Sequence, residues 1–531
     1  MCLACAADAI ALAEIASGGM TDPALNRSRL QDLANVAIAE TARLAPAVER
    51  VDVAAVNAKT NRQLYASRQK IYPKLAHGTF RWIKWAVMAV TLGIYYVLPW
   101  IRVDRGPALP HQAFLIDFAH QRLFLGPIEI WAQEFYLVTG LLILAALGLF
   151  LVTSLAGRVW CGYACPQTVW TDLMIAVERF WQGDRNSRIR LDQAPWSFDK
   201  IWRKTATHLS WLLIGLATGG AFVFYFRDAP TLASELWTGT APPVAWTFLA
   251  LFTGTTYLLG GIAREQVCTY MCPWPRIQGA MFDDDSLLVS YRPHRGEPRG
   301  PHKKGAGWEG RGDCIDCNSC VAVCPMGIDI RDGPQLECIQ CALCIDACDA
   351  VMNKIGRPSR LIAYETFNRL SAATSRKPLP PVRLIRPRTV FYGGLIAIVS
   401  TLMITALLMR DSVVASVLPD RNPLFVRLSD GAVRNGYTVD IANKKHEPLT
   451  LTVALDGLPG AELSLVGEAN GSSPVIEIKP DGLRAIKVNV TVPAATLPHL
   501  NGEATPFELV LTDGADGTKR RHHVTFRKPV S

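Results

Sequence analysis

The segment CIDCNSCVAVCP, residues 314–325, spaces four cysteines as C-x2-C-x2-C-x3-C. The same spacing returns in CIQCALCIDAC, residues 338–348. Two such runs are typical of bacterial ferredoxins with two [4Fe–4S] clusters, in which the fourth cysteine of each run binds the other cluster. The pattern therefore predicts one cluster on Cys314, Cys317, Cys320 and Cys348, and a second on Cys338, Cys341, Cys344 and Cys324.

A pair of structural zinc sites is the alternative, because zinc is also held by four thiolates. The repetition of the whole run favours clusters. Asp349 stands where a proline usually follows the last cysteine, and this departure concerns the local turn, since proline is not a ligand. Twelve of the fourteen cysteines lie between Cys161 and Cys348, which fits metal ligation in a reducing compartment better than disulfides.

The rest of the chain is strongly apolar. Of its 531 residues, 50% are hydrophobic and 19% are charged, which indicates that part of the chain lies in a membrane. Five segments are apolar over about 20 residues, the length that spans a bilayer. Their low charge and aromatic ends make buried helices of a soluble core a poor alternative. We predict spans at residues 81–100, 134–155, 207–226, 244–263 and 389–409.

The basic residues are distributed unevenly around these spans. They are concentrated before the first span, between the second and third, and in the long stretch before the fifth, whereas Arg227 is the only one between the third and fourth. Lysine and arginine favour the cytoplasmic side. We therefore expect a bacterial inner-membrane protein with its N-terminus and cysteine runs in the cytoplasm and its C-terminus in the periplasm. This topology accounts for the net charge of +9, and no nucleic-acid partner is needed.

From about residue 413 the chain alternates short apolar strands with turns such as Asp456-Gly457. We predict an immunoglobulin-like all-β sandwich. This segment has no cysteine, so no disulfide stabilises it. His522 and His523 are adjacent in a predicted strand and face opposite sides, which argues against a metal site. The predicted strands are 437–441, 450–455, 462–466, 475–478, 485–492, 507–511 and 524–526.

The predicted fold class is a multi-domain membrane protein. It combines an α-helical bundle of about five transmembrane helices, an inserted two-cluster ferredoxin-like α+β domain and the all-β sandwich. The expected divisions are an N-terminal extension (1–60), a membrane domain with four spans (61–300), the ferredoxin-like domain (301–375), the fifth transmembrane helix (389–410) and the sandwich (413–531). Cys2 and Cys5 are interpreted as incidental thiols.

A second cysteine motif occurs twice, in RVWCGYACPQ (158–167) and EQVCTYMCPWPR (265–276), each just after a predicted span. Cys161 and Cys268 are 107 positions apart, as are Cys165 and Cys272. In a continuing helix such a pair shares a face, with Cβ atoms about 5–6 Å apart, and the following proline ends or kinks the helix. The repeat is expected to gather the four thiols at the inner membrane surface.

Three interpretations of these thiols remain open. Thiolates favour Cu(I), which makes the four cysteines candidate copper ligands. Close pairs of thiols also cycle through a disulfide. Buried cysteines at helix ends that bind no ligand are the third interpretation.

In its paired ferredoxin-type runs and its repeated Cys-x-x-x-Cys-Pro motif, the sequence resembles the cytochrome c oxidase accessory proteins called FixG, RdxA or CcoG. The likeness covers roughly residues 64–531 and includes LYASRQKIYPKL, RVWCGYACPQTVWTDL, REQVCTYMCPWPRIQ, GEPRGPHKKG and GRGDCIDCNSCVAVCPMGIDIRDG. The resemblance implies a membrane polyferredoxin that supports maturation of the cbb-type haem–copper oxidase by reducing Cu(II) to Cu(I). Its implied partners are membrane lipid, copper ion, a copper chaperone or transporter and oxidase assembly factors.

Two other functions are considered. Quinol dehydrogenase subunits of nitrate- and nitrous-oxide-reductase systems also carry both motifs, and in that case the spans hold a quinol site and no copper is handled. His208, in the third span, is the histidine that such a site would use, although a helix-end histidine facing headgroups is the plainer interpretation. The fifth span and exported sandwich argue against this function. The other alternative is a non-catalytic assembly scaffold whose clusters only stabilise the fold.

Overall fold

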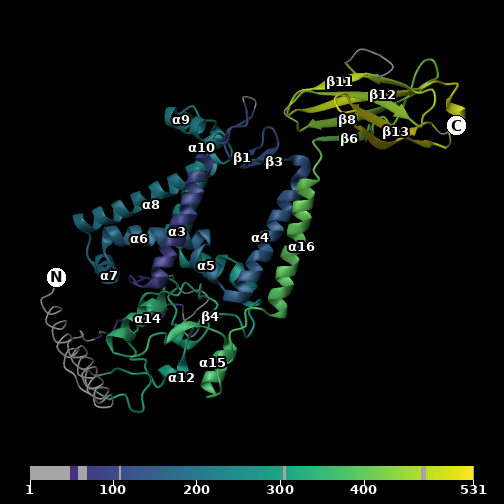
Figure 1. Cartoon of the computed structure of the whole chain (residues 1–531). Coiled ribbons are helices and arrows are strands. Elements are labelled where there is room, and N and C mark those ends of the chain that lie inside the picture. The colour runs from purple at the N-terminus through teal and green to yellow at the C-terminus, as the bar shows by residue number, and fades with distance from the viewer. Residues whose placement is uncertain are drawn as a thin grey trace, which may run out of the picture. The chain divides into compact units, whose positions relative to one another are not determined.

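The computed structural model describes residues 48, 50–57, 69–106, 109–302, 307–445, 447–467, 474–500 and 502–529. The chain divides into two compact units, Met1–Met403 and Ile404–Ser531, which are described separately (Figure 1). The expectation that Cys2 and Cys5 are incidental thiols falls outside the described residues.

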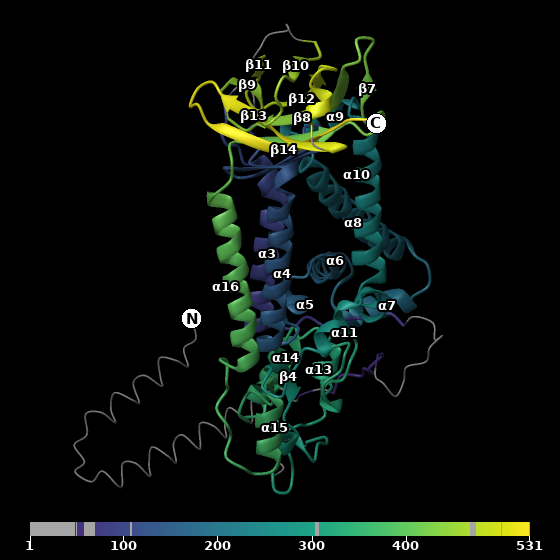
Figure 2. The ribbon, with the colours of Figure 1, turned by 90° about the vertical axis from the view of Figure 1, so that its right-hand side faces the viewer.

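Five helices in the described residues are long and apolar enough to cross a membrane, and they overlap the five predicted spans. Gly215 and Gly219 bring two of them close, because a Cβ on Gly219 would lie 2.8 Å from the Leu249 carbonyl oxygen. A third contact joins Gly140 to Met403, and Figures 1 and 2 show the two helices concerned side by side. The five are α3 (Thr79–Val97), α4 (Phe135–Ala156), α8 (Phe198–Phe224), α10 (Pro243–Thr256, continued by the π-helical segment Tyr257–Ala263) and α16 (Pro387–Leu408).

Helix α8 begins at Phe198, well before the predicted start of the third span at residue 207. The reason is a cap, since the Ser197 side chain accepts a hydrogen bond from the Lys200 amide. The first helical turns therefore carry basic residues that a hydropathy window rejects. Helices α6 (Pro166–Gln182) and α7 (Arg185–Gln193) lie in the connection between the second and third spans.

The sequence patterns did not predict a small sheet between α3 and α4. Its strands β1 (Phe114–Asp117), β2 (Arg122–Leu125) and β3 (Ile128–Trp131) form an antiparallel meander. Phe124, at the centre of β2, is fully buried. At four residues each, these strands are too short to show an alternating pattern. A further helix, α9 (Ala229–Thr238), lies between α8 and α10.

The ferredoxin segment is closed by two strands that are distant in sequence. β4 (Leu288–Tyr291) pairs antiparallel with β5 (Ile362–Glu365), and α13 (Ser319–Ala322) and α14 (Leu343–Lys354) carry cysteines between them. β4 lies before residue 301, where the ferredoxin-like domain was expected to begin. The cysteine pattern did not reveal this strand, because the strand carries no cysteine. Short helices α12 (Pro293–Gly296) and α15 (Phe367–Thr374) flank the pair.

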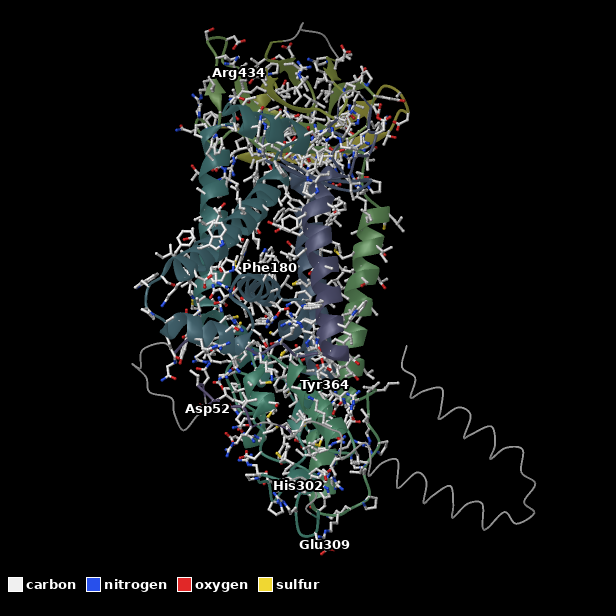
Figure 3. All side chains as sticks on the ribbon, turned by 90° about the vertical axis from the view of Figure 1, so that its left-hand side faces the viewer. Asp52, Phe180, His302, Glu309, Tyr364 and Arg434 are labelled. Carbon is white, nitrogen blue, oxygen red and sulfur yellow. The ribbon has the colours of Figure 1, made fainter. Side chains whose placement is uncertain are left out.

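A carboxylate fixes the ferredoxin segment to the first span. Asp346, on α14, accepts hydrogen bonds from the amides of Phe80 (3.2 Å) and Arg81 (2.7 Å) in the first turn of α3. A Cβ on Gly78 would lie 2.4 Å from the same carboxyl group, so this position has room only for glycine. Tyr364 of β5 marks the junction between the ferredoxin segment and the membrane helices in Figure 3.

The second unit is a sandwich of two antiparallel sheets. One has the order β10-β12-β8-β6, with β7 also paired to β8, and the other has the order β11-β9-β13-β14. All seven predicted strands overlap observed ones, and two strands were missed, the seven-residue β6 and the two-residue β7. Tyr437, Val439 and Ile441 alternate inward along β8 and are almost fully buried. The strands are β6 (Val413–Pro419), β7 (Val426–Arg427), β8 (Val433–Asn443), β9 (Leu449–Asp456), β10 (Glu462–Leu465), β11 (Val475–Ile478), β12 (Leu483–Val492), β13 (Ala504–Asp513) and β14 (Lys519–Arg527).

Candidate iron–sulfur and thiol sites

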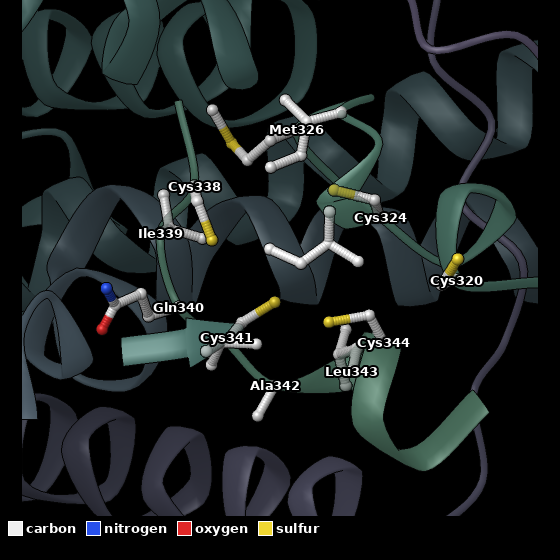
Figure 4. A pocket seen from close by; sticks show the side chains of 13 residues that line it. Cys320, Cys324, Met326, Cys338, Ile339, Gln340, Cys341, Ala342, Leu343 and Cys344 are labelled. Carbon is white, nitrogen blue, oxygen red and sulfur yellow. The ribbon is translucent and has the colours of Figure 1, made fainter. Parts of the chain in front are cut away.

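Two cysteine-lined pockets lie in the ferredoxin segment. Figure 4 shows four sulfur atoms facing the middle of one pocket, with Cys320 at its edge. The cysteines of that pocket are Cys324, Cys338, Cys341 and Cys344, together with Cys320. The other pocket is lined by Cys314, Cys317, Cys320 and Cys348. One pocket holds the four cysteines predicted for one cluster, and the other holds the four predicted for the second cluster together with Cys320, so this lining supports crossed ligation, which stays a prediction.

The backbone of the two cysteine runs repeats as closely as their sequences do. Asp316 and Asn318 have φ angles of 54° and 58°, and the equivalent residues Gln340 and Ala342 have φ angles of 56° and 60°. Residues in this left-handed region, placed between right-handed ones, form concave nests of amide N–H groups that bind anions, iron–sulfur centres among them. This unusual conformation, repeated in both runs, fits a pair of anionic clusters.

The burial of the thiols also fits cluster ligation. Burial raises the pKa of Cys320 and Cys324 to about 12 and that of Cys338 to about 11. Thiolates at such positions form only when a cation binds them. Within the described residues, no three histidine, cysteine, aspartate or glutamate side chains are arranged to hold a single metal ion. A cubane cluster does not need its four thiols to converge on one point, because each cysteine binds a separate iron atom.

Asp349 illustrates how the departure from the usual proline is accommodated. Its carboxylate accepts a hydrogen bond of 2.6 Å from the amide of Arg360. Without a proline after Cys348 the helix α14 runs on to Lys354, whereas α13 ends at Ala322, before Pro325, and Cys348 still lines its pocket.

The two Cys-x-x-x-Cys-Pro motifs each contain a break in the helix. Cys161 lies in the short helix α5 (Val159–Tyr163) and Cys268 in a π-helical turn (Val267–Met271). Cys165 and Cys272 follow these turns in extended conformation, with ψ angles of 128° and 122°. The helix thus ends at the proline as predicted, but the pairs do not share the face of one continuing helix, because the second cysteine is already outside it.

The internal repeat holds at the level of individual hydrogen bonds. The amide of Cys165 donates to the Trp160 carbonyl oxygen at 2.9 Å, and that of Cys272 donates to the Val267 carbonyl oxygen at 2.8 Å. Each bond spans five residues, a wide turn that swings the second cysteine out of the helix. The four thiols are close enough that charge on one raises the pKa of another: burial and then the neighbouring thiols raise the pKa of Cys268 to about 12.

Cys161 is held by a short chain of polar side chains. Its Sγ donates to Gln278 Oε1 at 3.1 Å, and Gln278 Nε2 donates to Thr153 Oγ1 at 3.2 Å. Burial raises the pKa of the Cys161 thiol, and the Arg158 guanidinium partly offsets this effect. Cys272, by contrast, is exposed. The site therefore has one buried and one accessible side.

Helix α5 packs directly on the second cysteine run. A Cβ on Gly162 would lie 2.7 Å from the Ile339 carbonyl oxygen, so the two backbones are in contact. Tyr163 Oη donates to the Cys341 carbonyl oxygen at 3.2 Å, and the Arg158 amide donates to Gln340 Oε1 at 3.0 Å. Cys161 and Cys268 consequently belong to the same buried cluster as Cys324, Cys338, Cys341 and Cys344.

Several residues around Cys268 were missed in the sequence. A small pocket that includes Cys268 is lined by Lys84, Asp172, Arg264 and Glu265. Asp172 forms an ion pair with Arg81 at 2.9 Å and Glu178 with Arg264 at 2.9 Å, and all four side chains are buried. The available signal was the pair of carboxylates Asp172 and Glu178, which lie in α6 shortly after the second predicted span.

Comparison with known proteins now gives these features a family. Residues 263–367 match the family described as "4Fe-4S dicluster domain", residues 138–182 match "4Fe-4S binding domain", and residues 403–529 match "IG-like fold at C-terminal of FixG". The nitrogen fixation protein FixG of Rhizobium meliloti is 50% identical over 512 residues, covering 91% of this chain and 97% of that protein. The chain belongs to the FixG/RdxA family.

Two further members support this conclusion. Protein RdxA of Cereibacter sphaeroides is 50% identical, covering 85% of this chain and 95% of that protein, and protein RdxB of the same organism is 51% identical, covering 87% and 97%. This FixG/RdxA-family member is an iron–sulfur electron-transfer protein with [4Fe–4S] domains, and its five apolar helices indicate a membrane protein. The individual ligand sets remain predictions that the pocket geometry supports.

Proposed function

We propose that this chain reduces Cu(II) to Cu(I) and so supports assembly of a cbb-type cytochrome c oxidase. The observation that carries the proposal is the packing of Cys161 and the partly buried Cys268 in one apolar cluster with Cys324, Cys338, Cys341 and Cys344. A soft-metal thiol site that touches an electron-transfer site is suited to single-electron reduction of a bound ion.

Cys161, Cys165, Cys268 and Cys272 bind the copper in this proposal. Because burial keeps the thiols of Cys161 and Cys268 protonated, each copper ion displaces protons as it binds. Gln278 orients the Cys161 thiol until that moment. Thiolate ligation then favours the softer, reduced ion. The exposed Cys272 is the natural point of entry.

The electron comes from within the same unit. When bound, the iron–sulfur clusters supply single electrons, and each Cu(II) takes up one to become Cu(I). The contacts of α5 with the loop at residues 339–341 hold the thiols against the second cysteine run: Gly162 by backbone packing, Tyr163 and Arg158 by hydrogen bonds. A chain with two reduced clusters accordingly yields two Cu(I) ions.

The remaining features concern placement and partners. The basic loops favour a bacterial cytoplasmic membrane with the cysteine runs inside and the sandwich outside. Partners are then membrane lipid, a cytoplasmic copper chaperone or transporter that exchanges Cu(I) through thiolates, and oxidase assembly factors. Cu(I) formed at the inner surface is in the form that such thiolate carriers bind.

The test uses full-length protein, purified without oxygen and reduced with dithionite, which is then removed. Added Cu(II) is followed with a Cu(I)-specific chelator while the cluster absorbance is recorded. We expect cluster re-oxidation to match Cu(I) formation, and we expect the double variant Cys161→Ser/Cys268→Ser to lose Cu(I) formation but keep the cluster spectrum. The exposed Ser234→Ala on α9 is the control and should behave as the unchanged protein.

Two outcomes would contradict the proposal. Normal copper binding and reduction by the double variant would place the site elsewhere. Iron analysis above eight atoms per chain, falling to eight in the double variant, would show that the four thiols hold a further cluster instead of copper.

A further inference from the structure

The lipid-facing side of α8 carries a groove with a volume of about 690 Å³. Its floor is one face of the helix, including Lys204, His208 and Leu212, and its wall is formed by Asp192 in the last turn of α7 and Trp196 in the loop that follows. Leu209 and Leu212 are 57% and 43% exposed, so the groove opens toward the bilayer. An occupant would keep an apolar tail in the lipid and place a polar head beside His208.

His208 is held in a defined orientation at this groove. Its Nδ1 lies 3.0 Å from the Tyr257 hydroxyl oxygen, and its ring stands edge-on to Trp211 with centroids 5.1 Å apart. In the tautomer in which Nδ1 donates to Tyr257, Nε2 is a proton acceptor. A packed, hydrogen-bonded histidine at the head position suits a ligand that gives up protons.

The contacts of Trp211 lead from the groove to the cysteine sites. The Arg264 guanidinium lies over the Trp211 ring at 5.1 Å. Arg264 in turn lines the small pocket that contains Cys268, Met326 and Ile339. Met326 and Ile339 also line the cysteine pocket shown in Figure 4. Continuous packing through named side chains therefore joins the groove to the electron-transfer site.

The charges of the groove argue for an uncharged head group. Lys204 forms an ion pair with Asp192, and Lys200 Nζ donates to the carbonyl oxygens of Asp192 and Ala194 at 2.9 and 2.6 Å. Both ammonium groups are thus already engaged, and a phosphate placed here would also face the Asp192 carboxylate. A phospholipid head is disfavoured on these grounds.

We propose that this groove binds a membrane quinol and that its oxidation supplies the electrons to the iron–sulfur clusters. This inference rests on the electron-transfer part of the proposed function and names its donor. One quinol gives a quinone, two protons and two electrons. The O–H bonds break, His208 Nε2 accepts the protons one after the other and releases them to water at the mouth of the groove, and the two electrons would pass one to each of the two clusters. Two clusters that each hold one electron would accept both electrons of a quinol and pass them singly to Cu(II).

The experiment has a binding arm and a redox arm. Full-length protein in nanodiscs is irradiated with an azido-ubiquinone, and labelled peptides are identified by mass spectrometry. We expect labels within residues 192–212, and we expect unlabelled decylubiquinone to compete them away. In the redox arm, decylubiquinol is added to oxidised protein without oxygen, and cluster bleaching is recorded between about pH 6 and pH 8.

The variant His208→Gln keeps a hydrogen-bonding side chain but removes the proton acceptor. It should slow cluster reduction by decylubiquinol by roughly 10²-fold and flatten the pH dependence, while reduction by dithionite gives the same spectrum. Tyr257→Phe, which removes the hydrogen bond that orients the His208 ring, should have a smaller effect in the same direction. His120→Gln in the β1–β2 turn is the matched control, and it should change neither arm.

The proposal is overturned if the quinone label lies outside α8, or if His208→Gln and His120→Gln reduce at the same rate. It is also overturned if phosphatidylglycerol, and not decylubiquinone, protects α8 from labelling, because the groove is then a lipid site. Copper reduction by dithionite-reduced protein is independent of these outcomes, so the two proposals fail separately.

Discussion

Gly162 is the position at which the contact between the thiol site and the cluster segment is tested most directly. Changing Gly162→Ala adds a Cβ that lies 2.7 Å from the Ile339 carbonyl oxygen and 3.0 Å from the Cys341 Cα, both backbone atoms. Overpacking of this kind costs about 1–3 kcal/mol. Alanine in a helix otherwise gains about 1 kcal/mol over glycine, so a control is needed to separate the two effects.

Gly254→Ala supplies that control. Gly254 lies in α10, and a Cβ there meets nothing within 4 Å. Both variants share the helix-propensity gain, so the difference between them isolates the contact, about 1–3 kcal/mol. That difference lowers the melting temperature of Gly162→Ala by several degrees relative to Gly254→Ala, at roughly 2–4 °C for each kcal/mol.

The assay combines scanning fluorimetry in detergent with copper reduction by dithionite-reduced protein. Gly162→Ala should also reduce Cu(II) more slowly, since α5 is pushed off the Ile339–Cys341 backbone, while its iron content stays normal. Equal melting temperatures and equal copper-reduction rates in the two variants would refute the close contact and its role.

Three further predictions follow from the structure. Asp346→Ala should lower the free energy of unfolding by about 1–2 kcal/mol, with Asp346→Asn intermediate, because the α3 amides lose their cap; thermal scans measure this. Burial alone would raise the pKa of Glu178, but Arg264, Lys70 and Arg188 hold it at about 2. Since that pKa is below its unfolded value, the carboxylate stabilises the fold above about pH 4.5 and loses this effect as pH falls toward 2. Glu178→Gln should therefore lower the free energy of unfolding by about 3 kcal/mol at pH 7 and by progressively less in acid. A reporter after Ser531 should read as exported and one near Gly305 as cytoplasmic; the same side for both would mean a miscounted span.

The spacing of the cysteines carries most of the information about the clusters. The spacing predicts the crossed ligand sets, and the two pockets gather those cysteines, with Cys320 lining both pockets. The left-handed residues at 316, 318, 340 and 342 were not predictable, because only Asn318 and Asp316 belong to types that favour that conformation. Gln340 and Ala342 adopt it because the surrounding loop requires it.

The contacts that join segments distant in sequence were the part that sequence reasoning missed. Asp346 carries no signal of its role, since the helix it caps begins more than 260 positions earlier. Gln278 and Tyr163 likewise act through tertiary contacts that no local pattern encodes. Hydropathy identified the five spans because membrane burial is a property of composition. It did not identify the capped, basic first turns of α8, where the cap and not apolarity decides the start.

The two repeats keep one backbone and use it for different purposes. Gly157 (φ 60°) and Arg264 (φ 47°) stand 107 positions apart and share an unusual conformation just before each motif. At Gly157 the adjoining space is filled by the Gln340 side chain, 2.4 Å from where a Cβ would lie, so only glycine fits. At Arg264 a side chain is accommodated despite a backbone cost of about 1–2 kcal/mol. That side chain pairs with Glu178 and lies over Trp211, which offsets the cost. The first repeat thus packs on the second cysteine run, and the second repeat packs on α6 and α8 through the contacts of Arg264 with Glu178 and Trp211.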